Sequence, residues 1–307
     1  MGYDVIGDIH GQAGKLEALL QKLGYVRRAS GWIPPLGRQA VFLGDLIDRG
    51  PEQVKVVNTV RSMIDAGHAR SVMGNHEFNA IGYATPRRGV PGEFLRRHSP
   101  KNLSQHIEFL QQVGEGSDLH REMVEWFKAL PPMLDLGGIR VVHAWWHQPH
   151  VDLVASRLPS GRVIDEDFLH AAYVKGSTEW GAMEGLTKGL EVRLPVGYSF
   201  VDHSNVERGE VRTKWWHEAP KSYRDVAIVG DAQHHRVPDH PLPEDYAGAP
   251  VTGVPVFIGH YWMSGIPELQ SPRVACVDYS AAKDGPLVAY RWDGEVELDA
   301  AHFVEAG

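Results

Sequence analysis

Cysteine is almost absent from this chain of 307 residues, which contains only Cys276. A single cysteine excludes a disulfide framework, and it also excludes zinc sites built on several thiolates. Any metal ion must therefore be held by imidazole and oxygen ligands, for which 17 histidines and 39 acidic residues are available. Cys276 itself lies between Ala275 and Val277 and is expected to be an inert core thiol.

Long hydrophobic runs and an excess of positive charge are also missing. No apolar stretch approaches the roughly 20 residues needed to span a bilayer, which argues against a membrane protein. The first residues do not combine a basic region with an apolar stretch, so we expect no targeting segment and a cytoplasmic location. The net charge of −8 argues against a broad nucleic-acid-binding surface but leaves room for a local basic pocket.

The N-terminal part of the chain alternates strand and helix patterns. Short buried-strand patterns occupy 3–7, 40–43 and 70–73. Helical patterns lie between them at 16–23 and 51–67, each closed by or followed by a glycine. This alternation predicts a parallel sheet with right-handed crossovers.

A polar motif follows each of the three strands. The motifs are Gly-Asp-Ile-His-Gly at 7–11, Gly-Asp-Leu-Ile-Asp-Arg-Gly at 44–50 and Gly-Asn-His-Glu at 74–77. One such motif alone is typical of a turn. Three in succession at the carboxyl ends of parallel strands, where ligands bind in such sheets, indicate a site.

The residue types in these motifs suit a pair of cations. Asp8 and His10 are two residues apart in an extended stretch and can grip one cation, while Asp45 can bridge to a second. Asn75 adds a neutral oxygen, which limits the negative charge so that a phosphate can approach. Two cations about 3.5–4 Å apart can clamp a phosphoryl group and generate hydroxide from water at neutral pH.

In this order, the three motifs resemble those of the calcineurin-like metallophosphoesterase superfamily. The Asp-Arg-Gly ending of the second motif and the Glu of the third are similar to the phosphoprotein-phosphatase branch. That branch includes serine/threonine phosphatases, bacterial symmetrical diadenosine tetraphosphatases and the phosphatase domain of bacterial polynucleotide kinase-phosphatase. Segments 139–144 and 254–260 are similar to the strands that deliver the family's later histidine ligands, and 274–278 and 288–292 to its closing strands.

The resemblance implies a role for each matching residue. Asp8 and His10 would hold the first metal and Asp45 would bridge, while the second site would be completed by Asn75, His143 and His260. His76 would be the catalytic histidine, oriented by Asp48, and the phosphate would be bound by Arg49 and Asn75. Asp278 would support the metal site. The implied cofactors are two divalent ions, either Mn or a mixture of Fe and Zn.

The same resemblance implies the fold and the reaction. We expect a single α/β domain over 1–307, a four-layer metallophosphoesterase β-sandwich flanked by helices, with cap insertions at about 83–130 and 145–250. The implied reaction is hydrolysis of a phosphomonoester or phosphoanhydride by a metal-bridging hydroxide, without a covalent enzyme intermediate. A nucleotide or other small phosphorylated molecule is the expected substrate, and a serine/threonine protein phosphatase is the alternative.

Two further alternatives rank lower. A nucleic-acid end phosphatase comes third because the chain is acidic. A metal-binding scaffold without catalysis would lack a ligand, the arginine or the catalytic histidine, and none of these is missing.

The insertions, and the positions at which the motifs differ from the family pattern, do not determine which residues form the substrate pocket. Trp145 and Trp146 stand where the family usually has glycine, and Tyr261 and Trp262 stand where it often has Thr-Pro. The candidates for a second phosphate-binding cation are Arg212, Lys214 and Arg224, and the sequence does not choose among them. The histidines and tryptophans of 145–250 either pack or line the pocket.

Overall fold

The computed structural model describes residues 1–29, 31–158, 164–202 and 205–307. The chain forms two compact units, the first from Met1–Lys188 and Val254–Gly307 and the second from Gly189–Gly253. Parts of the expected 145–250 insertion, at 159–163 and 203–204, lie outside the described residues. The division into one domain with two insertions stays a prediction.

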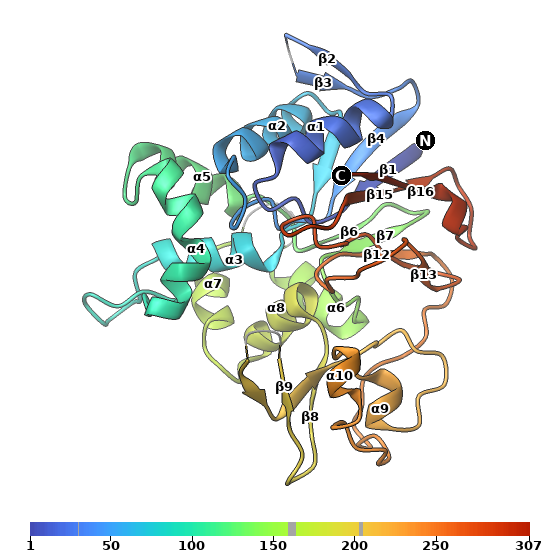
Figure 1. Ribbon diagram of the computed structural model, residues 1–307. Helices are drawn as coiled ribbons and strands as arrows, with labels where there is room; N and C mark the ends of the chain where they lie inside the picture. Colours follow the sequence, from blue (N-terminus) through green and yellow to red (C-terminus); the bar gives the residue numbers. More distant parts are fainter. Residues whose placement is uncertain (30, 159–163, 203–204) are drawn as a thin grey trace. The chain divides into compact units, whose positions relative to one another are not determined.

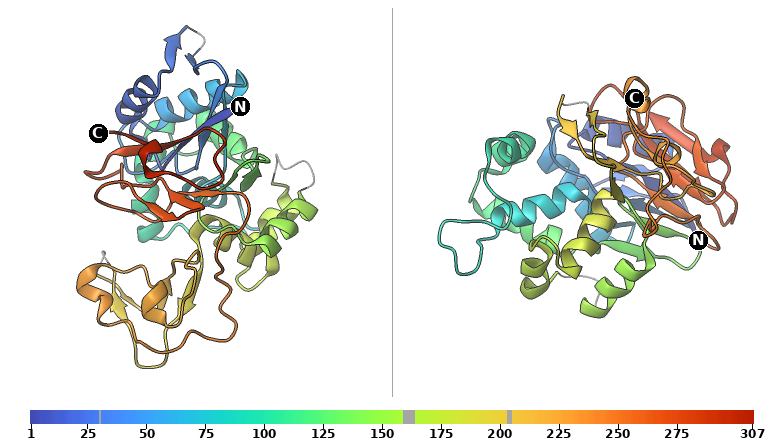
Figure 2. Two further views of the ribbon diagram at one scale, coloured as in Figure 1. Left: turned by 90° about the vertical axis from the view of Figure 1, so that its right-hand side faces the viewer. Right: turned by 90° about the horizontal axis from the view of Figure 1, so that it is seen from below.

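The first sheet of the first unit has the strand order β16-β15-β1-β4-β5. The strands are β1 (Gly2–Ile6), β4 (Arg38–Phe42), β5 (Ala69–Ser71), β15 (Leu287–Trp292) and β16 (Phe303–Ala306). β1, β4 and β5 are parallel, as the alternating pattern predicts, with Val5 beside Val41 and Ala40 beside Ala69. β15 and β16 extend the sheet in antiparallel fashion, so both ends of the chain enter it (Figures 1 and 2).

Two helices connect the parallel strands of this sheet. They are α1 (Ala13–Lys22) and α2 (Gln53–Asp65), which lie side by side against it (Figure 1). α1 buries Leu16, Leu19 and Leu20, the leucines whose spacing predicted the helix. The hairpin of β2 (Val26–Arg28) and β3 (Gly31–Ile33) between α1 and β4 was not predicted; the residues of β2 are exposed, whereas Trp32 of β3 is buried.

The second sheet has the order β13-β14-β12-β7-β6. Its strands are β6 (Met133–Asp135), β7 (Arg140–Val142), β12 (Val256–Ile258), β13 (Leu269–Ser271) and β14 (Val274–Cys276). β7, β12 and β14 are parallel, and the two edge strands are antiparallel to their neighbours.

The core of the first unit lies between the two sheets. Val5 and Val41 of the first sheet belong to the same buried cluster as Val141 and Phe257 of the second. The rings of Phe257 and Tyr290 lie 5.1 Å apart across the interface. The apolar area removed from water here is the main stabilising contribution to the fold. The predicted α/β sandwich flanked by helices is confirmed.

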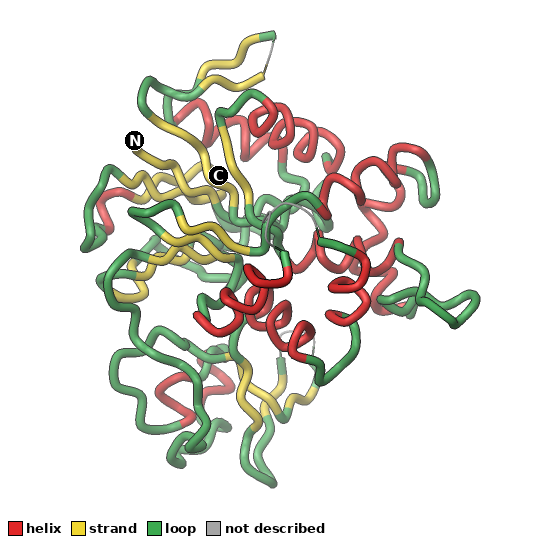
Figure 3. Tube along the Cα trace, turned by 180° about the vertical axis from the view of Figure 1, so that it is seen from behind, coloured by secondary structure: helices red, strands yellow, loops and turns green. Residues whose placement is uncertain are grey.

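Six further α-helices belong to the described part of the first unit. They are α3 (Asn75–Ala84), α4 (Pro100–Val113), α5 (Asp118–Lys128), α6 (Gln148–Arg157), α7 (Glu166–Ala172) and α8 (Thr178–Lys188), which gather beside the sheets (Figure 3). The expected helical insertion at 83–130 contains α4 and α5. α4 starts where Ser99 Oγ accepts the Asn102 N–H at 3.2 Å, with Pro100 in its first turn.

The second unit is built mostly from loops (Figure 3). Its strands β8 (Glu191–Arg193) and β11 (Glu210–Arg212) form one pair, and β9 (Phe200–Val201) and β10 (Glu207–Arg208) form another. Two short helices follow, α9 (Tyr223–Val226) and α10 (Asp231–His234).

A short 3₁₀ helix (Ala300–His302) precedes β16 in the first unit. None of the helices in the described ranges is both long and apolar enough to cross a membrane.

Candidate metal centre

The predicted ligands all follow strands of the two sheets. Asp8 and His10 follow β1, and Asp45 follows β4. Asn75 is the first residue of α3, just after β5, while His143 and His260 follow β7 and β12. The structure therefore brings together residues more than 250 positions apart, and all six of these side chains are buried.

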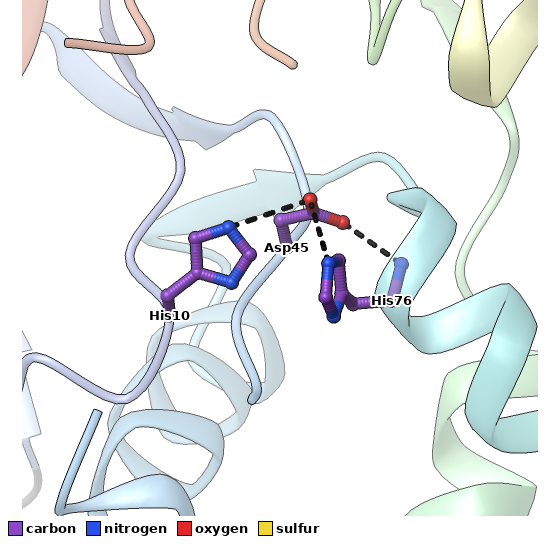
Figure 4. A group of neighbouring side chains, drawn as sticks. All are labelled: His10, Asp45 and His76. Atoms are coloured by element: carbon purple, nitrogen blue, oxygen red, sulfur yellow. Dashed lines mark hydrogen bonds and ion pairs between the residues drawn. The ribbon is translucent and has the colours of Figure 1, made fainter. Parts of the chain in front are cut away.

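The Asp45 carboxylate is the centre of this group. Its Oδ2 lies 3.4 Å from His143 Nε2 and 3.6 Å from His10 Nε2. Ligand atoms converge within 4.8 Å of one another in two sets, His10 with Asp45 and His76, and Asp45 with His143 and His260. Figure 4 shows the rings of His10 and His76 turned towards the same carboxylate. One carboxylate shared by two sets of donors is an arrangement that could hold a pair of cations.

The backbone fixes the orientation of two of these histidines. His10 Nδ1 lies 2.8 Å from the Ile47 carbonyl oxygen, and His143 Nδ1 lies 2.6 Å from that of Leu43. Because a carbonyl oxygen can only accept, Nδ1 carries the N–H in each case; in the neutral ring, the form that binds a metal, the lone pair is then on Nε2, which faces Asp45. Metal-ligating histidines are held in the same way.

The remaining donors fit a cation site. Asp8 Oδ2 accepts the His260 N–H at 3.1 Å, and Asn75 Oδ1 lies 3.1 Å from His143 Nε2. Asp8 Oδ1 and His10 Nε2 are buried and have no hydrogen-bond partner among the described residues. A buried polar atom without a partner destabilises the fold unless something binds it, so these atoms fit ligands of a metal ion. The donors are oxygen and imidazole, as the scarcity of cysteine requires.

Buried negative charge dominates the electrostatics of the centre. Burial and then the neighbouring Asp278 raise the pKa of Asp8 well above its usual value. Burial alone would lower the pKa of His143, but Asp45 and Asp8 outweigh it and raise that pKa to about 10. The carboxylates thus attract positive charge, which divalent cations would supply.

His76 lies next to this centre and is held by Asp48. Its Nδ1 is 2.5 Å from Asp48 Oδ2, while Asp48 Oδ1 is 2.7 Å from Nδ1 of His106, a residue of α4. Burial would raise the pKa of Asp48, but the hydrogen bonds from His106 and His76 lower it to about 2. The Asp48 carboxylate is therefore ionised at neutral pH and orients both rings. A role for His106 was not predicted from the sequence, because a histidine within a helical pattern gives no sign that it belongs to a site.

Arg49 stands at the exposed rim of the site. Its Nη2 lies 3.4 Å from His76 Nε2, and its guanidinium carbon lies 4.1 Å from the centre of the Trp262 ring. A planar, exposed guanidinium beside the ligands suits the oxygens of a phosphate.

Backbone strain is concentrated at this centre. Among the described residues, eight other than glycine have positive φ angles: His10, Asp45, Asp48, Arg49, Asn205, His260, Trp262 and Ser280. Five of these eight are predicted site residues, and Trp262 and Ser280 contact them directly or through Asp278. Each such conformation costs on the order of 1–3 kcal/mol and persists where the surroundings hold it, most often at functional sites.

Two glycines are required by close approach to the carboxylates. A Cβ at Gly74 would lie 2.2 Å from Asp45 Oδ1, and a Cβ at Gly259 would lie 2.1 Å from Asp8 Oδ1. Any side chain at either position would therefore displace a predicted ligand.

Glu77 also supports the metal centre, and in the sequence only the resemblance to the family pointed to it. Its carboxylate is fully buried and accepts the N–H groups of Asp45 at 2.8 Å, Leu46 at 2.8 Å and Gly74 at 2.9 Å. Burial and the nearby Asp45 raise its pKa to about 7. Glu77 joins the loops after β4 and β5 and so places Asp45.

Replacing Glu77 by alanine should lower the free energy of unfolding by about 3 kcal/mol or more, because three buried N–H groups lose their acceptor. Urea denaturation of the purified variant measures this change. Glu93→Ala, at an exposed position of the first unit, is the control and should change stability little. A stability of Glu77→Ala equal to that of Glu93→Ala would contradict this role.

The other predicted residues are placed as follows. Asp278 Oδ2 accepts the Trp262 N–H at 2.8 Å and Oδ1 accepts the Ser280 N–H at 3.0 Å, so it ties together two loops next to the ligands. Trp145 stacks on His147 at 4.3 Å, and Trp146 packs on Arg140 at 5.1 Å. The three candidates for a second phosphate-binding cation belong to the second unit: Arg212, Lys214 and Arg224.

The sequence profile of the calcineurin-like phosphoesterase family matches residues 1–251. The matched range includes every predicted site residue except His260 and Asp278, which the structure adds to the same centre. The match covers more than half of the chain.

Several curated relatives are named bis(5′-nucleosyl)-tetraphosphatase. The asymmetrical enzyme PrpE of Bacillus subtilis is 30% identical over 189 residues, which are 56% of this chain and 75% of that protein. The symmetrical enzyme of Aromatoleum aromaticum is 33% identical over 144 residues, 47% of this chain and 44% of that protein. PrpE of Anoxybacillus flavithermus is 47% identical over 76 residues, 31% of its length.

Solved structures show a similar fold. A serine/threonine phosphatase from Saccharomyces cerevisiae aligns with a TM-score of 0.53 over 99% of this chain and 78% of that chain. The two sequences are 15% identical, so the likeness concerns the fold.

Proposed function

The chain belongs to the calcineurin-like phosphoesterase family and is a metallophosphoesterase, and we propose that its substrate is a nucleotide with a phosphoanhydride bond, such as a dinucleoside tetraphosphate. The names of the relatives support a nucleotide substrate. The observation that carries the reaction type is the Asp45 carboxylate, shared by two sets of buried donors beside Arg49 and His76.

The residues divide into two sets of ligands. In our proposal, Asp8, His10 and Asp45 would hold one cation, and Asp45 with Asn75, His143 and His260 would hold the other; His10, His143 and His260 converge on Asp45, Asp8 Oδ2 accepts the His260 N–H, and Asn75 Oδ1 lies 3.1 Å from His143 Nε2. Bound divalent cations polarise a phosphoryl group and lower the pKa of bound water. Oxygen and imidazole donors suit Mn, Fe and Zn, and we propose Mn or an Fe/Zn pair as the native metals.

The remaining groups of the site bind the phosphate and move a proton. Arg49 presents its fork of N–H donors to the phosphate oxygens, which become more negative in the transition state. The bond between phosphorus and the leaving oxygen breaks as water's oxygen bonds to phosphorus, and His76 gives the leaving oxygen a proton. Asp48 keeps His76 in the correct orientation through the 2.5 Å contact to Nδ1. Its negative charge also favours the protonated ring.

A substrate panel tests this proposal. Purified protein supplied with Mn²⁺ is given diadenosine tetraphosphate, AMP, a phosphoserine peptide and an oligonucleotide with a 5′-phosphate. We expect kcat/KM for diadenosine tetraphosphate to exceed that for the peptide by at least about tenfold, and we expect a chelator to abolish the activity. A preference for the peptide would identify a protein phosphatase instead, and a preference for the oligonucleotide would identify a nucleic-acid end phosphatase.

A further inference from the structure

Two cationic side chains share one tryptophan ring at the rim of the metal centre. The guanidinium carbon of Arg49 lies 4.1 Å from the centre of the Trp262 ring, and Nζ of Lys283 lies 4.3 Å from it. The ring is partly buried, whereas both cations are exposed. Arg49 comes from the loop after β4, and Lys283 comes from the loop between β14 and β15.

Hydrogen bonds fix the loop that carries Lys283. Lys15 of α1 extends its ammonium group into this loop and donates to the carbonyl oxygens of Ala281 at 2.9 Å and Gly285 at 2.7 Å. The Lys283 N–H donates to the Ser280 carbonyl oxygen at 2.8 Å. The base of the loop is therefore held on both sides of Lys283.

Trp262 is fixed by the same loop. Asp278 accepts the backbone N–H groups of Trp262 and Ser280, and the Ser280 hydroxyl donates to the Met263 carbonyl oxygen at 3.2 Å. Trp262 and Ser280 have positive φ angles of 53° and 61°, a backbone conformation that residues other than glycine adopt only at a cost in free energy. The backbone at Trp262 and the base of the loop that carries Lys283 are thus held by the protein itself.

Neither cation is paired with a carboxylate in the part of the chain that the structure describes. Within the described ranges, neither the Arg49 guanidinium nor the Lys283 ammonium forms an ion pair with a carboxylate, although the chain as a whole carries a net charge of −8. Two like charges on one ring repel each other unless an anion lies between or beside them. Since each lies within 4.3 Å of one ring centre, a single polyanion can contact both.

We propose that Lys283, supported by Trp262, binds the phosphate that adjoins the one held by Arg49, so that the site selects substrates with contiguous phosphates. This inference rests on the proposed hydrolysis at the Asp45 centre and adds which substrates are preferred there. A phosphomonoester has no second phosphate and gains nothing from Lys283. A phosphoanhydride gains a charge-assisted hydrogen bond.

Binding and kinetics of Lys283→Ala test the inference. ADP and AMP share one nucleoside and differ in one phosphate, so each serves as a competitive inhibitor of p-nitrophenyl phosphate hydrolysis and as a ligand in calorimetry. In the Lys283→Ala variant, we expect ADP to bind about tenfold more weakly and AMP within twofold of the wild-type value. Hydrolysis of p-nitrophenyl phosphate should stay within twofold. Lys283→Arg should restore most of the ADP affinity.

The control variant is Lys101→Ala, which removes one exposed lysine charge from α4 and should leave both affinities unchanged. Equal weakening of ADP and AMP, or no change in ADP binding, would overturn the role of Lys283. Calorimetry gives this answer even if diadenosine tetraphosphate is not hydrolysed, a result that would count against the proposed substrate instead. If Lys101→Ala lost as much ADP affinity as Lys283→Ala, the change in the protein's net charge would explain the weaker binding, and the inference would also be overturned.

Discussion

An Asp45→Asn variant should lose at least about a thousandfold in kcat and should bind less metal than the wild type. The carboxylate is shared by two sets of donors, and its Oδ2 faces the Nε2 atoms of His10 and His143 at 3.6 Å and 3.4 Å. Removal of its charge weakens both proposed sites at once, and metal ions supply several kcal/mol of transition-state stabilisation. Steady-state kinetics and metal analysis of the purified variant measure the two effects.

The fold should survive this substitution. Asparagine has nearly the same shape as aspartate. Its amide oxygen can still accept the backbone N–H of His76, which Asp45 Oδ1 accepts at 2.9 Å. Thermal melting checks this, and Asp65→Asn at the exposed end of α2 is the matched control. Wild-type activity with a full complement of metal in Asp45→Asn would remove Asp45 from the centre.

A His76→Ala variant should lose about a hundredfold to ten-thousandfold in kcat, while it binds as much metal as the wild type. The His76 Nε2 atom lies among the donors around Asp45 at 3.9 Å from Oδ2, so proximity alone does not exclude it as a ligand. Two contacts favour proton transfer instead. Asp48 holds Nδ1, and the Arg49 guanidinium lies 3.4 Å from Nε2, where its charge opposes a metal ion.

The expected loss depends on the leaving group. A leaving group that is stable as an anion, such as p-nitrophenolate, needs less help from a proton donor than an alkyl alkoxide. His76→Ala should therefore impair an alkyl phosphate more than p-nitrophenyl phosphate, and His68→Ala in the loop before β5 should impair neither. A loss of metal in His76→Ala would make His76 a ligand.

Much of the centre was predictable because its residues follow strands at close sequence spacing. The motifs around Asp8, Asp45 and Asn75 stand at the ends of β1, β4 and β5, whose apolar patterns and intervening helices are legible without a structure. His143 and His260 could be added only through the family likeness, since a histidine at a strand end is more often a hydrogen-bonded core residue.

The residues that support the centre were harder to predict, because their contacts cross long sequence distances. His106 reaches Asp48 from a helix 58 positions away. Lys15 and Lys283 are 268 positions apart, yet the Lys15 ammonium lies 3.4 Å from the Lys283 carbonyl oxygen. The sequence offers Arg212, Lys214 and Arg224 as candidates for a second phosphate-binding cation, and no local pattern in it connects Lys283 with Trp262.

A metal titration of chelator-treated protein, in which bound Mn²⁺ and hydrolysis of p-nitrophenyl phosphate are followed together, is the most direct test of two cation sites at Asp45. If the Asp45 carboxylate joins two cation sites, binding saturates at two ions per chain, and full activity requires both. Full activity without metal, or saturation of both binding and activity at one ion per chain, would contradict a two-cation centre at Asp45.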